Sequence, residues 1–362
     1  MQDNLEYYLT LILSGLSLGK QKYILSTFED LQQLSSIDKY DGKITKIITS
    51  AEFDKLRDII ASNATKKHLS GIKRNGIDVI SIDNEYYPEC LRNIEEPPLV
   101  LYYRGDIQLL NTDCIAIVGS RVCTRYGREQ TSFFAQSLSK AGFTIVSGLA
   151  DGIDTHAHRG TLDVSGKTIA VLAGGLNTIY PAINTDLAHE IVEKGGLLIS
   201  ENIPTFLPKG YAFVQRNRII AGISMGVFVP EMGEKSGAMH TLNFANEEGR
   251  MIFALPGNVN SSSSKGANNL IKSLQGACVT EPSDIINNYP EHQVAVIKKI
   301  TENYKQLDVY ENIILDALKI EETHFDELLD KTKLEAKKLL GILTTMEIRG
   351  LIRKIAGNCY TI

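Results

Sequence analysis

The sequence lacks three features that define large classes of proteins. No apolar run reaches the roughly 20 residues of a membrane-spanning helix, and the first residues lack the basic segment of a secretory signal. The five cysteines occur singly, without a CxxC pair, which argues against a disulfide framework or a zinc ribbon. We therefore expect a cytoplasmic protein with no membrane partner.

Enzyme signatures are also missing, because each sequence that imitates one has the wrong context. Residues 166–168 (GKT) precede a predicted strand, whereas a phosphate-binding loop follows one. Residues 222–226 fit GxSxG, but a predicted helix precedes them and a strand follows, the reverse of a nucleophile elbow. The first core strand ends in GSR (119–121) instead of GxGxxG, which argues against NAD binding. We assign no catalytic residue and expect no cofactor.

The one candidate metal cluster has poor geometry. Asp154, His156 and His158 alternate along a predicted helix, where residues two apart point in nearly opposite directions. The remaining histidines are isolated in the sequence. We therefore expect no metal site.

What is present divides into three regions. Residues 1–85 have apolar residues at helical spacing and predict a helical domain. Residues 86–290 contain short, continuously apolar runs separated by helical stretches, which predict a parallel sheet covered by helices on both faces. Residues 300–362 contain three helix-like segments and a final hairpin centred on Gly357 and Asn358, as in a winged helix. The seven predicted strands of the central region are 99–105, 114–120, 143–148, 168–175, 196–201, 226–231 and 251–257.

The charges of the central region are unevenly distributed. Four stretches contain no Asp or Glu, although the whole chain has a net charge of −5: 114–128, 164–185, 202–230 and 249–280. Buried strands exclude acids in any protein, but the loops and polar helices beside them normally carry both signs. We therefore expect a basic site for phosphate. The cations of these stretches are Arg121, Arg125, Arg128, Lys167, Lys209, Arg216, Arg218, Arg250, Lys265 and Lys272.

Residues 209–220 are the most informative part of that region. In a helix, Phe213, Arg216 and Asn217 share one face, and Lys209 lies near its start. An aromatic ring beside cations and an amide suits single-stranded nucleic acid, whose bases stack while its backbone is neutralised. Arg218 points about 200° away from Arg216, so we expect it to be held in the core. A core phenylalanine beside solvated arginines is the alternative.

Eight segments, in order, resemble the DprA/Smf family of DNA-processing proteins. They are AIVGSR (116–121), SGLADGIDTHAH (147–158), TIAVLAGGLNTIYPAIN (168–184), LLISE (197–201), Phe213 with RNRIIAGIS (216–224), SGAMHT (236–241), EGRMIFALPGNV (248–259) and KGANNLI (265–271). The resemblance implies a Rossmann-like core between an N-terminal SAM-like domain and a C-terminal winged helix. It also implies a homodimer without enzymatic activity that binds single-stranded DNA and delivers it to the recombinase RecA in natural transformation.

The resemblance further implies which residues contact DNA. They lie in a phosphate-binding loop (Gly119, Ser120, Arg121), in the basic-aromatic helix (Lys209, Phe213, Arg216, Asn217) and in a second glycine-rich loop (Ser236, Gly237). Independently of the resemblance, Ser147 and Gly148 are candidates because ligands bind at the carboxyl ends of parallel strands, and Arg218 is the remaining candidate.

Two other functions remain open on a fold of this kind. A LOG-type nucleoside monophosphate phosphoribohydrolase would need PGGxGTxxE, whereas residues 234–241 are followed by no glutamate until Glu247. A sensor that binds a small nucleotide in the same pocket is the second alternative.

Overall fold

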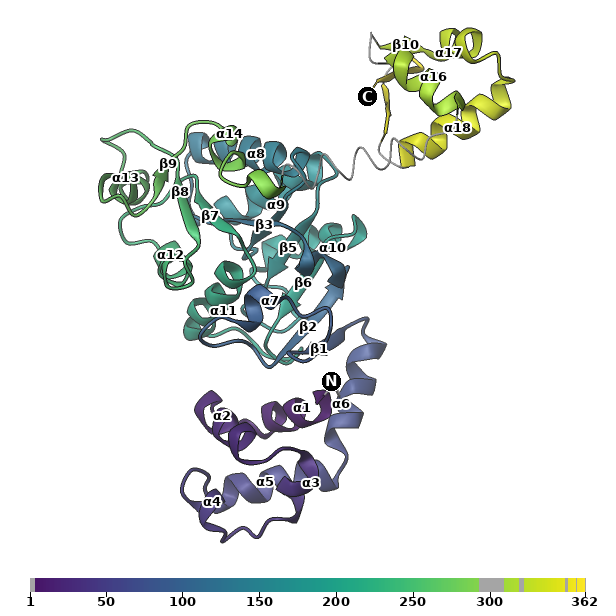
Figure 1. The fold of residues 1–362 in the computed structure, drawn as a ribbon. Helices are drawn as coiled ribbons and strands as arrows, with labels where there is room; N and C mark the ends of the chain where they lie inside the picture. The colour runs from purple at the N-terminus through teal and green to yellow at the C-terminus, as the bar shows by residue number, and fades with distance from the viewer. Residues whose placement is uncertain (1–3, 293–308, 319–321, 349–350, 356, 362) are drawn as a thin grey trace. The chain divides into compact units, whose positions relative to one another are not determined.

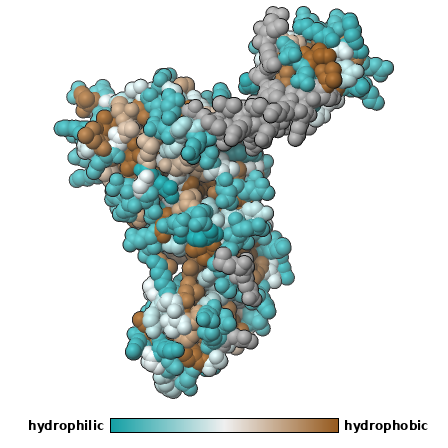
Figure 2. Space-filling model, viewed as in Figure 1, coloured by the Kyte–Doolittle hydropathy of each residue, from teal (hydrophilic) through white to brown (hydrophobic). Residues whose placement is uncertain are grey.

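A computed structural model describes residues 4–292, 309–318, 322–348, 351–355 and 357–361. The chain forms two compact units, residues 1–289 and 290–362. In the part of the chain that the structure describes, no helix is both long and apolar enough to cross a membrane. Figure 2 shows a largely hydrophilic surface with small scattered apolar areas.

The first unit begins with the expected helices. They are α1 (Leu5–Ser14), α2 (Leu18–Thr27), α3 (Leu31–Ser36), α4 (Gly42–Thr45), α5 (Ser50–Ala61) and α6 (Ala64–Arg74). Thr49 and Glu52 form a capping box at the start of α5, where Glu52 also pairs with Lys20 at 2.6 Å. These helices have their own apolar core, and α1 and α6 pack against the edge of the sheet that follows.

Within the described residues, one sheet joins nine strands in the order β1-β2-β6-β5-β4-β3-β7-β8-β9 (Figure 1). All seven predicted strands are present. The strands are β1 (Asp78–Ser81), β2 (Val100–Gly105), β3 (Cys114–Ile117), β4 (Thr144–Ser147), β5 (Thr168–Val171), β6 (Leu197–Ser200), β7 (Gly226–Val229), β8 (Met251–Ala254) and β9 (Ala277–Cys278).

The expectation of a wholly parallel sheet is wrong at one end. Strand β2 pairs antiparallel with β6, and β1 pairs antiparallel with β2. The run at 99–105 looks like the parallel strands because its first half is equally buried. An apolar run reports burial and carries no information on strand direction.

The domain boundary expected near residue 85 lies too late in the chain, because β1 precedes it and is already a strand of the core sheet.

Helices cover both faces of the sheet, as the continuous apolar runs predict. One face carries α8 (Arg125–Lys140), α9 (Ile153–Asp163), α10 (Thr185–Glu193) and α14 (Pro282–Ile286); the other carries α7 (Glu89–Arg92), α11 (Gly210–Gly222), α12 (Ala238–Glu247) and α13 (Lys265–Lys272). Successive residues of β3 serve opposite cores: Ile115 and Ile117 pack with Phe134 of α8, and Ala116 belongs to the cluster that contains Ile219 of α11. This confirms the Rossmann-like core.

The second unit is the expected winged helix. It contains α16 (Val309–Leu318), β10 (Thr323–His324), α17 (Phe325–Thr332), α18 (Ala336–Ile348), β11 (Arg353–Ile355) and β12 (Cys359–Thr361). The strands form a sheet in the order β10-β12-β11. Gly357 and Asn358 both have positive φ between β11 and β12, as a tight hairpin requires.

Candidate functional site

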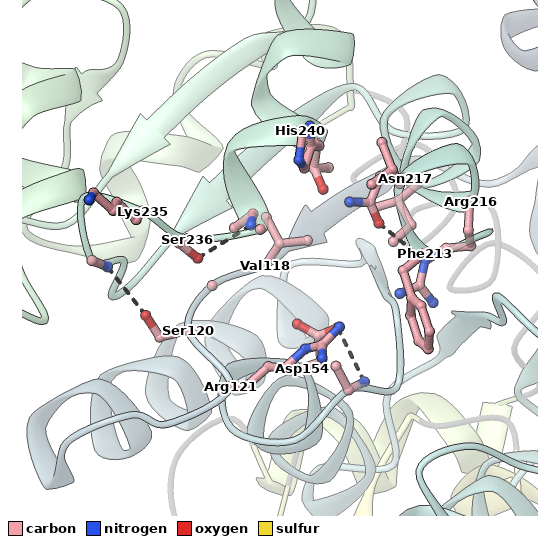
Figure 3. Close-up of a pocket in the computed structure, with 18 of the residues that line it drawn as sticks. Val118, Ser120, Arg121, Asp154, Phe213, Arg216, Asn217, Lys235, Ser236 and His240 are labelled. Carbon is pink, nitrogen blue, oxygen red and sulfur yellow. Dashed lines mark hydrogen bonds between the residues drawn. The ribbon is translucent and has the colours of Figure 1, made fainter. Parts of the chain in front are cut away.

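A pocket of about 780 Å³ opens at the carboxyl ends of β3 and β7. Strand β3 pairs with β4 on one side and with β7 on the other, so the strand order of the sheet reverses at this point. Ligands of open α/β sheets bind in this crevice. Figure 3 shows Ser120 and Arg121 on one side of it, facing Asn217 and His240. The lining residues are Val118–Val122, Ala150, Asp154, Gly210, Phe213, Val214, Arg216, Asn217, Ile220, Gly233, Lys235–Ala238, His240 and Thr241.

The loop after β3 is tied to the loop after β7. The amide of Ser120 donates to the carbonyl oxygen of Glu231 at 3.0 Å, and the Ser120 hydroxyl accepts from the amide of Gly233 at 3.3 Å. A Cβ atom on Gly119 would lie 2.5 Å from the Glu231 oxygen, so only glycine permits this approach. Both loops therefore reach the pocket in a fixed position, with Ser236 and Gly237 in the lining.

Phe213 lies in the pocket wall and is only partly buried, which separates it from the core residues of α11. The Arg121 guanidinium lies over its ring at 5.3 Å from the centroid. Tyr180 contacts the same ring at 5.5 Å between centroids, with 62° between the planes. An aromatic ring under an exposed cation is therefore accessible from the pocket.

Arg216 lies in the floor of the pocket and is only 5% exposed. Its Nη1 donates to the carbonyl oxygens of Gly148, at 2.7 Å, and Val171, and its Nε donates to Asn217 Oδ1 at 3.2 Å. Burial lowers the pKa of Arg216 to about 10, so the side chain stays charged at neutral pH. The sequence predicts a phosphate-binding arginine here, whereas the structure uses most of its donors within the protein.

Asp154 lies beside Arg216 in the same floor. Its Oδ2 accepts from the amides of Gly148 at 3.0 Å and Ala150 at 3.3 Å. Burial raises the pKa of Asp154, and the Arg216 charge and the two amides oppose that rise. Asp154 thus fixes the turn after β4 and balances a buried cation. From the sequence, Asp154 is considered only as a metal ligand, and this structural role is not predicted.

Four predicted DNA-contacting residues, Ser147, Gly148, Arg218 and Lys209, lie outside the lining, and the first three have structural roles. Ser147 is fully buried and donates its hydroxyl to the Ile117 carbonyl at 2.7 Å. A Cβ on Gly148 would lie 2.6 Å from Arg216 Nη2, so this glycine makes room for the guanidinium. Arg218 is 7% exposed and pairs with Glu201, as its helical phase predicts.

Lys209 is exposed at the N-cap of α11, next to lining residue Gly210. Two exposed lining residues, Lys235 and His240, are not predicted from the sequence to contact a ligand. They lie on either side of Ser236 and Gly237, so the position of this glycine-rich loop after a predicted strand could have indicated them.

The imitations of enzyme motifs have structural roles. Ser224 is buried after the end of α11 and donates to the Ile220 carbonyl at 2.8 Å. His158 is buried with its Nδ1 2.7 Å from the Thr168 hydroxyl, and burial lowers the pKa of His158 to about 3. Among the residues that the structure describes, no three His, Cys, Asp or Glu side chains gather to hold a metal ion.

Comparison with known proteins identifies the family of this chain. The model of the DNA recombination-mediator protein A family matches residues 78–290, and the model of the DprA winged helix domain matches residues 301–358. The chain belongs to this family. The first match contains every lining residue of the pocket, and the second contains α16 to β11 of the winged-helix unit.

Relatives and solved structures of the DprA/Smf family agree. Protein Smf of Escherichia coli is 44% identical over 58% of this chain and 56% of its own length, so the match spans little more than half of that relative. DNA processing protein DprA of Bacillus subtilis is 40% identical over 62% of this chain and 76% of its own. The crystal structure of DprA from Streptococcus pneumoniae superposes with a TM-score of 0.69 at 34% identity, covering 79% of this chain and 98% of that one.

Proposed function

We propose that this protein binds single-stranded DNA in the pocket at the ends of β3 and β7. The observation that carries the proposal is Phe213: a partly buried ring at the pocket wall, with the exposed Arg121 over it. A base stacks on such a ring whatever its sequence, and a cation beside it neutralises the backbone.

The remaining lining residues supply contacts for phosphate and sugar. We assign phosphate to Gly119, Ser120 and Arg121, to the loop at Ser236 and Gly237, and to Lys209 at the entrance. Asn217 can donate and accept hydrogen bonds toward the ligand. Support comes from DNA processing protein A of Helicobacter pylori, a relative of known structure with a unique single-stranded DNA binding mode. That structure has a TM-score of 0.54 and 32% identity over 59% of this chain and 96% of its own.

We propose that the pocket binds DNA without a catalytic step. A LOG-type reaction would need the glutamate that lies three residues after the threonine in PGGxGTxxE, whereas the first glutamate after Thr241 is Glu247. Glu247 is the last residue of α12, six residues beyond the lining residue Thr241 and thus about 9 Å further along the helix.

A salt series tests this function directly. We expect labelled oligothymidylate to bind more tightly than a duplex of equal length, with log K falling linearly with log salt, by fluorescence anisotropy. Equal affinity for both forms would contradict the proposal. Displacement by AMP at comparable concentrations would favour the small-nucleotide sensor, and release of adenine would favour the LOG-type reaction.

We further propose that the protein acts as a homodimer that delivers its bound strand to RecA. The support is membership of the DNA recombination-mediator family. Stoichiometric protein should accelerate RecA assembly on single-stranded DNA, followed through DNA-dependent ATP hydrolysis; an unchanged rate would contradict delivery.

Light scattering at micromolar concentration should give twice the 40.0 kDa chain mass, and a 40.0 kDa particle would contradict the dimer.

A further inference from the structure

Tyr180 lies in a loop held firmly beside the pocket. This loop follows β5 and leads into the short 3-10 helix η2 (Ala182–Asn184). The side-chain Nδ2 of Asn184 donates to the Leu149 carbonyl oxygen and to the Thr155 hydroxyl, each at 2.9 Å. These bonds attach the loop to the turn after β4 and to the first turn of α9, and the turn after β4 also borders the pocket through Ala150.

The ring of Tyr180 is more open than that of Phe213. Tyr180 is 52% exposed, although its ring contacts Phe213 at 5.5 Å. Phe213 is partly buried and already has Arg121 over its face. A base that stacks on Phe213 must use its remaining surface or displace Arg121, whereas Tyr180 offers ring surface directly to solvent.

The charge around Tyr180 also suits a polyanion. The stretch 164–185, which contains Tyr180, has no Asp or Glu. The Phe213 ring contacts Tyr180 and also lies under the Arg121 guanidinium, so a cation is close to Tyr180. Two adjacent rings beside a cation can hold neighbouring bases of one strand, because base stacking on aromatic side chains repeats along single-stranded DNA sites.

We propose that Tyr180 is a second base-stacking surface, which extends the DNA site from the pocket onto the loop between β5 and η2. This inference rests on the proposed function of the pocket. It predicts that the base next to the one on Phe213 stacks on Tyr180.

The test pairs protein variants with modified DNA. Tyr180→Ala and Tyr180→Leu should each weaken oligothymidylate binding by about 5- to 20-fold, and Tyr180→Phe should bind like the native protein. Tyr180→Leu keeps apolar bulk in the loop, so its melting temperature should stay near the native one. Tyr211→Ala is the matched control, because Tyr211 is 57% exposed on α11 and absent from the pocket lining; its affinity should not change.

A single abasic site moved along the oligonucleotide then locates the contact. At one position, the loss caused by Tyr180→Leu should disappear, because the base that stacks on Tyr180 is already missing. A loss of equal size at every abasic position, or no loss on the intact strand, would overturn the inference.

The same series separates this inference from the proposed function. If Phe213→Ala weakens binding while Tyr180→Leu does not, the pocket binds DNA and the second surface is wrong. If native protein binds single strands no better than duplexes, the proposed function itself fails.

Discussion

The rim and the floor of the pocket each contain an arginine, and the two have opposite environments. We define the rim as Ser120, Arg121, Phe213 and Lys235, and the floor as Asp154 and Arg216. Arg121 is exposed and lies over an aromatic ring. Arg216 is 5% exposed, donates to two backbone carbonyl groups and lies near a buried carboxylate.

This difference teaches that lining a pocket does not make a side chain free to bind. A buried cation that serves carbonyl oxygens cannot turn to a phosphate without leaving those oxygens unpaired, which costs free energy. An exposed cation on a ring loses little when it turns to a ligand. We therefore expect the rim to control affinity and the floor to control stability.

The largest expected effect is on the floor. Arg216→Met leaves two buried carbonyls and Asp154 without their cation, so the free energy of unfolding should fall by about 3–5 kcal/mol. Thermal denaturation measures this, and both single-strand and duplex binding should be lost with the fold. Arg125→Met is the control, because Arg125 makes an exposed ion pair with Glu129 and should change stability little. A native melting temperature with a reduced salt slope would make Arg216 a phosphate ligand after all.

The next effect is on the rim. Phe213→Ala should weaken single-strand binding by about 5- to 100-fold, the range for one base on an aromatic ring. Duplex binding should hardly change, because paired bases cannot splay onto the ring. The measurement is anisotropy on both substrates together with a melting curve. An equal loss on both substrates with a lower melting temperature would make Phe213 a packing residue.

A third prediction concerns pH and the residues behind the floor. His158 is buried, and its pKa is lowered from 6.5 to about 3, so the unfolded chain binds a proton at pH values where the native protein does not. Its contribution to stability is complete above pH 6.5 and is lost as the pH falls toward 3. Between pH 7 and pH 5 the free energy of unfolding should fall by about 2 kcal/mol from this residue.

Urea denaturation at each pH measures this dependence, and His158→Gln should remove most of it. A variant that keeps the native pH dependence would show that other groups cause it.

The smallest expected effect is at Arg121. Arg121→Ala should leave the melting temperature within the small range of surface substitutions. It should lower the slope of log K against log salt by about 0.7 unit, the value for one phosphate on a single strand. Lys140→Ala, which removes an exposed charge from the last turn of α8, is the charge-matched control. An unchanged slope would show that Arg121 serves only to cover Phe213.

Much of the fold could be predicted because burial leaves a direct trace in the sequence. The apolar runs that end in small residues give β3 to β8, and the pair Gly357 and Asn358 gives the hairpin of the winged helix. Helical phase also places Phe213 and Asn217 in the pocket and Arg218 outside it. The direction of β2 could not be predicted, because an antiparallel edge partner leaves no trace in an apolar run.

The sequence by itself determined the layers, the loop after β3 and the face that α11 presents to the pocket, because these follow from periodicity over neighbouring residues. The tertiary structure alone decided which arginine is free. Arg216 is buried because Gly148, Val171 and Asp154, from elements far apart in the chain, converge on it. Tyr180 likewise meets Phe213 from another loop. No local pattern records such contacts, since they depend on how strands distant in sequence are ordered in the sheet.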